Sequence, residues 1–69
     1  MIRNDQELEA TSDRIRYFQE QVEQLRRSET NPHNYRLSAS GFIAEIDRMN
    51  LDIREYLSLH PSEIKNQAA

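Results

Sequence analysis

Apolar residues recur at alternating steps of three and four in two stretches of the chain, one in each half. Such steps return to the same side of an α-helix, so each stretch is expected to form a helix with a narrow apolar seam that packs against another helix. The helices are predicted over about residues 5–28 and 38–59. The predicted seam consists of Leu8, Thr11, Ile15, Phe18, Val22 and Leu25 in the first stretch and Ala39, Phe42, Ile46, Met49, Ile53 and Tyr56 in the second.

The ends of the first helix carry sequence signals of their own. Asn4 is followed three residues later by Glu7. At this spacing the asparagine side chain can accept a hydrogen bond from an early backbone N–H of the helix, and the Glu7 carboxylate can reach back to the start of the helix. Arg26 and Arg27 lie at the other end, where positive charge suits the helix dipole. We therefore expect this helix to begin near Asn4 or just after it and to end near residue 28.

A stretch rich in Ser, Thr, Asn and Pro separates the two helices. Asn31 precedes Pro32, which disfavours the helical conformation at Asn31 and predicts that the first helix stops there. We expect a turn or loop over residues 28–37 and a second helix that begins near Ser38 or Ser40, either of which can cap it. Gly41 then falls in the first turn of that helix, where its cost in helix propensity is small.

The two seams match each other if the helices form an antiparallel hairpin. The connecting stretch is too short for parallel packing, which favours that arrangement. One register aligns the apolar residues and leaves a polar end, away from the turn, that frays or docks a partner. Its predicted pairs are Leu25 with Phe42, Val22 with Ile46, Phe18 with Met49, Ile15 with Ile53, Thr11 with Tyr56 and Leu8 with His60.

Apolar residues outside the seam predict a further interface. A lone hairpin buries one line of contact on each helix, whereas two hairpins in a four-helix bundle bury a wider stripe. We therefore expect a symmetric homodimer of hairpins. The alternative is that these residues are scattered exposed side chains without a function. The candidate partner interface consists of Tyr17, Ile43, Leu51, Leu57 and Leu59.

Size and composition also favour association. The chain has 69 residues, enough for one small domain, predicted over residues 1–60 and followed by a tail over 61–69 that is a short turn or disordered. It has no cysteine, so oligomerisation is the remaining common way to stabilise a core of this size. No signal peptide or membrane-spanning run is visible, and we expect a cytoplasmic protein without membrane contact.

No catalytic, cofactor-binding or metal-binding residue can be assigned, so we expect neither an enzyme nor a small-molecule binder. His33 and His60 lack helical partners at metal-ligand spacing and are interpreted as surface or capping residues. Lys+Arg 9 against Asp+Glu 12 argues against nucleic-acid binding. A small nucleic-acid-associated regulator is nevertheless the alternative hypothesis, and it would use Arg14, Arg16, Arg26 and Arg27.

Three parts of the chain resemble the N-terminal helical region of some bacterial antitoxins. They are residues 1–8 (MIRNDQEL), the following heptad through Ile15 and Phe18, and residues 51–57 (LDIREYL). In that family a hairpin of about this length precedes a helix-turn-helix DNA-binding domain of the Xre type. The resemblance covers roughly residues 1–60 and implies toxin neutralisation, dimerisation or both. The 69 residues contain no counterpart of the DNA-binding domain, so autorepression is not carried over.

These observations lead to one main hypothesis about function. We expect a non-enzymatic protein–protein interaction module, a small homodimeric helical hairpin. Its most concrete version is an antitoxin-like component that neutralises a toxin-like protein partner.

Overall fold

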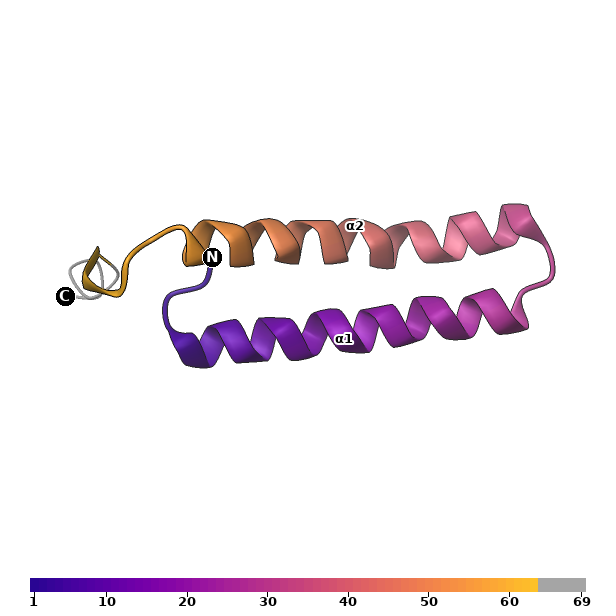
Figure 1. Cartoon of the computed structure of the whole chain (residues 1–69). Coiled ribbons are helices and arrows are strands. Elements are labelled where there is room, and N and C mark those ends of the chain that lie inside the picture. Colours follow the sequence, from indigo (N-terminus) through magenta and orange to yellow (C-terminus); the bar gives the residue numbers. More distant parts are fainter. Residues whose placement is uncertain (64–69) are drawn as a thin grey trace.

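Two long helices lie side by side and antiparallel in the computed structural model, which describes residues 1–63 (Figure 1). Helix α1 spans Asp5–Ser28 and helix α2 spans Pro32–Leu57. The molecule is elongated, with principal extents of 50 × 16 × 15 Å. The prediction of an all-α antiparallel hairpin is confirmed.

Helix α1 begins and ends where the sequence predicts. The Asn4 side chain accepts a hydrogen bond from the backbone N–H of Glu7 at 2.8 Å. The Glu7 carboxylate reaches back as expected, but it accepts from the N–H of Arg3 at 2.8 Å. At the other end the N–H of Glu29 donates to the carbonyl of Leu25 at 2.9 Å. Orphan backbone groups at both ends are thereby satisfied.

Helix α2 begins at Pro32, so the prediction that it starts near Ser38 or Ser40 is wrong. Asn31 keeps the extended backbone that a residue before proline prefers, and its side chain accepts from the N–H groups of His33 at 2.9 Å and Asn34 at 3.3 Å. Proline suits the first helical position because its φ is already helical and its missing N–H would have no partner there. The Asn-Pro pair that stops α1 therefore also starts α2, and the turn is confined to residues 29–31.

The end of α2 lies slightly before its predicted limit of residue 59. The helix ends at Leu57, and the N–H of Ser58 donates to the carbonyl of Arg54 at 3.0 Å. A further helical turn begins over residues 61–63, where the N–H of Glu63 donates to the carbonyl of His60 at 2.9 Å. The remainder of the predicted tail, residues 64–69, lies outside the described residues.

The short turn sets a register that differs from the predicted one by a heptad. The rings of Phe18 and Phe42 meet edge to face with centroids 5.5 Å apart. At the open end the hydroxyl of Tyr56 donates to the carboxylate of Asp5 at 2.6 Å. The predicted pairing of Phe18 with Met49 is therefore wrong, together with the other pairs of that register. Sliding one helix by a heptad again aligns apolar with apolar residues, so the length of the turn decides between the registers.

The observed register gives every seam residue of α1 a new partner. Tyr35, which lies in the predicted loop, is helical and half-buried and comes opposite Leu25. Val22 comes opposite the small and buried Ala39. Continuing the register from Phe18 and Phe42 along both helices then places Ile15 opposite Ile46, Thr11 opposite Met49 and Leu8 opposite Ile53.

The buried core is small and includes a residue outside the predicted seam. Ile2, from the segment before α1, is only 7% exposed. The seam contributes the other buried side chains, which are Ile15, Ala39, Met49 and Tyr56. The remaining seam residues are half-buried, namely Leu8, Thr11, Phe18, Val22, Leu25, Phe42, Ile46 and Ile53. One line of helix–helix contact thus leaves much of the seam partly open to solvent.

Candidate functional site

The residues predicted to form a partner interface are mostly exposed. Ile43 and Leu51 are each 44% exposed, Tyr17 56% and Leu57 65%, whereas Leu59 is half-buried just beyond α2. Leu37, which sequence reasoning placed in the loop, is a further exposed apolar side chain of α2 at 65%.

These side chains do not form a single patch. At about 100° per residue, Ile43 and Leu57 share one flank of α2, and Leu51 lies further round that helix. Tyr17 comes about two turns after Ala10, which lines a hollow on the other face of the hairpin. The flank with Ile43 and Leu57 is therefore separate from Tyr17.

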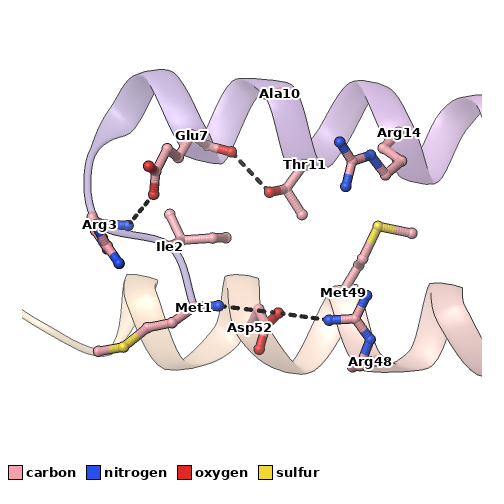
Figure 2. A pocket seen from close by; sticks show the side chains of 10 residues that line it. All are labelled: Met1, Ile2, Arg3, Glu7, Ala10, Thr11, Arg14, Arg48, Met49 and Asp52. Carbon is pink, nitrogen blue, oxygen red and sulfur yellow. Dashed lines mark hydrogen bonds and ion pairs between the residues drawn. The ribbon is translucent and has the colours of Figure 1, made fainter.

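A segment before α1 folds across the open end of the hairpin, as Figure 2 shows. Ile2 inserts between the helices, and the N–H of Arg3 is held by the Glu7 carboxylate. The α-amine of Met1 lies 3.8 Å from the carboxylate of Asp52 on α2. Together these residues and their neighbours line a hollow of about 450 Å³. Sequence reasoning missed this contact because a single isoleucine before the first cap carries no periodic signal.

Arg48 links the charged side chains on this flank of α2. Its guanidinium lies 2.6 Å from the Glu45 carboxylate and 3.7 Å from that of Asp52 (Figure 2 shows the latter). The hydrogen bond from Arg48 to Glu45 raises the pKa of the Arg48 guanidinium, and the charges of Glu45 and Asp52 add to that effect. Arg48 and Glu45 are exposed, so solvent screens their ion pair and it adds little stability, and the pair with the half-buried Asp52 is longer. Their consequence is that the charges of Glu45, Arg48 and Asp52 are paired within the chain.

A hydrogen bond between the helices closes the open end of the seam. Tyr56 is 7% exposed, and its hydroxyl donates to Asp5. The hydrogen bond to the Asp5 carboxylate, followed by burial, raises the pKa of Tyr56 above its ordinary value of 10.0. The expectation that Tyr56 would pair with Thr11 in a loose polar end is wrong. The hydrogen bond of Tyr56 and the insertion of Ile2 therefore join the two helices at this end.

The two histidines lie near helix starts, His33 in the first turn of α2 and His60 just before the turn at residues 61–63. The backbone N–H of His33 donates to Asn31 at the start of α2. His60 interacts with the hydroxyl of Ser62 through its Nδ1 at 2.9 Å, and its N–H donates to Glu63 at 3.2 Å. Within residues 1–63 no group of three His, Asp or Glu side chains lies close enough together to hold a metal ion. Neither described helix has a stretch long and apolar enough to cross a bilayer.

The four arginines of the nucleic-acid alternative are exposed and spread around α1. Arg14 and Arg16 are about 200° apart on the helix, and Arg16 pairs with Asp13 at 3.2 Å. Arg14 lines the hollow beside the segment before α1, whereas Arg26 lines a separate one near the turn, and Arg27 follows it on the next side of the helix. They do not form the continuous basic surface that nucleic-acid binding uses.

A polar hollow on α2 lies next to the exposed Ile43 and Leu57. It has a volume of about 340 Å³ and is lined by Asp47, Asn50, Leu51 and Arg54. Of these, sequence reasoning selected only Leu51. The signal that could have found the others is their spacing, since Asp47, Asn50 and Arg54 continue the steps of four and three that start at Ile43 and end at Leu57.

Comparisons of this chain with protein-family models, with curated proteins and with solved structures found no match.

Proposed function

We propose that this chain is a non-enzymatic protein–protein interaction module that dimerises into a four-helix bundle. The observation that carries the proposal is the incomplete burial of its apolar residues. Phe18 and Phe42, at the centre of the hairpin, remain half-buried, and Ile43 and Leu57 on the flank of α2 are exposed. A second hairpin against this side would remove more apolar surface from water than the lone hairpin does.

The size of the core supports the same proposal. Domains of this length rarely gain more than roughly 3–5 kcal/mol from a single core without a disulfide, metal or partner. The chain has no cysteine, so disulfides are excluded. Buried side chains among residues 1–63 number only five hydrophobic residues, one of them an alanine. Association with a second copy would add apolar burial that this small core does not supply by itself.

The state of association is tested by sedimentation equilibrium together with thermal unfolding over a range of protein concentrations. A dimer predicts twice the chain mass and a Tm that rises with concentration, because association stabilises the folded state by mass action. A monomer with a concentration-independent Tm at the highest attainable concentration contradicts the proposal.

The resemblance to antitoxins supplies the more specific version of this function. In it, the hairpin binds a toxin-like protein and blocks its activity. The test is co-expression with a small ribonuclease-like toxin encoded next to the gene for this chain. Restored growth and co-purification of the two proteins support toxin neutralisation. Undiminished toxicity with both proteins present contradicts it and leaves the dimer to be judged by sedimentation.

A further inference from the structure

Five residues form a second stripe along α2, beside the seam. They are Ile43, Asp47, Asn50, Arg54 and Leu57, spaced by four, three, four and three. This spacing keeps them on one line along a helix, and all five are exposed. The stripe has apolar residues at its two ends and polar residues in the middle, which border the hollow of about 340 Å³.

The two charges of the stripe have no ion-pair partner among residues 1–63. Asp47 and Arg54 are seven residues apart, about 10 Å along the helix axis, too far to pair with each other in one chain. Glu45, Arg48 and Asp52, on the other flank of the same helix, are all paired. Asp47 and Arg54 are thus available to an external partner.

We propose that this stripe packs antiparallel against the same stripe of a second copy, around a two-fold axis at Asn50. The inference rests on the proposed homodimer and specifies its contact. In this register Ile43 meets Leu57 of the second copy, and Asp47 meets Arg54 of the second copy. The two copies of Asn50 meet at the centre. Each contact occurs twice, as the symmetry of a two-fold interface requires.

Charge decides the orientation of the two copies. In a parallel arrangement each Asp47 would approach the other Asp47 and each Arg54 the other Arg54, and like charges in an interface are costly. The antiparallel arrangement turns both repulsions into attractions. Antiparallel packing is also the arrangement of α1 and α2 within the hairpin, where Phe18 lies opposite Phe42.

Asn50 sets the register of this contact. A carboxamide has donors and an acceptor, so two asparagines that meet on the axis can hydrogen-bond to each other. Sliding the helices by a heptad would leave Asn50 facing Ile43 or Leu57 of the second copy, and a polar residue that faces an apolar one disfavours that register. The apolar contacts of Ile43 and Leu57 on either side then exclude water from the centre.

The first test uses charge reversal and its rescue, measured by sedimentation equilibrium at low salt. Asp47→Arg and Arg54→Asp each place like charges opposite each other and are expected to weaken self-association about tenfold or more. An equimolar mixture of the two variants restores both attractions, as does the variant that carries both changes. Glu20→Arg, a reversal on exposed α1 surface, is the matched control and leaves association unchanged. Circular dichroism of each variant checks that the helices are intact.

The second test places a thiol on the axis. The chain has no cysteine, so Asn50→Cys introduces the only one, and mild oxidation is expected to yield a disulfide-linked dimer. Tyr17→Cys, on the other face of the hairpin, is the control and remains uncrosslinked. A dimer in which Tyr17→Cys crosslinks, or in which neither the mixture nor the double variant is rescued, overturns this contact and leaves the homodimer standing. A chain that is monomeric throughout overturns both.

Discussion

The two flanks of α2 differ in how their charges are satisfied. On one flank, Arg48 pairs with Glu45 and Asp52, and Asp52 also receives the α-amine of Met1. This flank, which we call the covered flank, lies beside the segment that inserts Ile2 between the helices. The charges of Glu45, Arg48 and Asp52 are paired within one chain, and Ile2 beside this flank belongs to the buried core.

The opposite flank, which we call the open flank, carries the stripe from Ile43 to Leu57. Its charges at Asp47 and Arg54 lack partners within the described chain, and its apolar residues are exposed. The two flanks of one helix thus differ in which of their charges are paired within the chain. Changes on the covered flank are expected to alter the stability of each hairpin, and changes on the open flank its association.

The largest expected effect is at the segment before α1, which lies beside the covered flank. Ile2→Ala removes a side chain that is 7% exposed and leaves a gap between the helices, which is expected to lower the free energy of unfolding by about 2–5 kcal/mol. Urea unfolding at matched protein concentration measures it. Leu37→Ala, at an exposed apolar position, is the control and changes stability by less than about 0.5 kcal/mol. Equal effects of the two variants would mean that the segment before α1 does not contribute to the core.

On the open flank, the variant with both Ile43→Ala and Leu57→Ala is expected to weaken self-association. Each truncation removes apolar surface from the contact, and together they raise the dimer Kd by about tenfold or more. The helical content of the monomer stays the same because both side chains are exposed in the lone hairpin. Sedimentation at several concentrations measures the change. If Tyr17→Ala, on α1, weakens association as much, the contact is not confined to the open flank.

A substitution at Gly41 tests whether another part of the molecule packs against α2 at this position. Gly41 lies in the interior of α2, not in its first turn as predicted, and an added Cβ would meet nothing within 4 Å. Gly41→Ala is therefore expected to raise the free energy of unfolding by about 1 kcal/mol through helix propensity alone. Ala44→Gly, also exposed on α2, should lower it by a similar amount. A destabilising Gly41→Ala would show that another part of the molecule contacts this position.

The smallest effect at neutral pH is expected for Tyr56→Phe, since phenylalanine keeps the buried ring and Asp5 remains hydrated. The difference appears at alkaline pH. The folded state raises the pKa of Tyr56 above 10.0, so its contribution to stability is complete below that pH and is lost as the pH rises through the folded-state pKa. Thermal unfolding between neutral and strongly alkaline pH measures this loss, which Tyr56→Phe should reduce. Tyr17→Phe is the control, and an alkaline loss that persists unchanged in Tyr56→Phe excludes this hydroxyl as its source.

Local features of the fold could be predicted, and longer-range ones could not. The ends of α1 follow from Asn4, Glu7 and the residues around Ser28, all of which act within one turn of the chain. The start of α2 was mispredicted because Pro32 was interpreted only as a stop signal, although proline also suits the first position of a helix. Because of that error the predicted turn was too long, and the predicted register was therefore wrong as well.

The candidate site shows the same division. Exposure of Ile43, Leu51 and Leu57 follows from their positions outside the seam. The grouping of Ile43 and Leu57 with Asp47, Asn50 and Arg54 also lies in the spacing, but its meaning depends on which charges are paired inside the chain. That distinction required the observed contacts of Arg48.

The sequence by itself determined that there are two helices, where α1 begins and ends, and which side of each helix is apolar. These properties depend on periodicity and on caps, which act over a few residues. Only the tertiary structure decided the register, the insertion of Ile2 and the bond between Tyr56 and Asp5. The physical reason is that a heptad repeat matches its partner again after every seven residues, so its own pattern cannot choose between registers. The turn at residues 29–31 makes that choice, and the contacts at the open end follow from it.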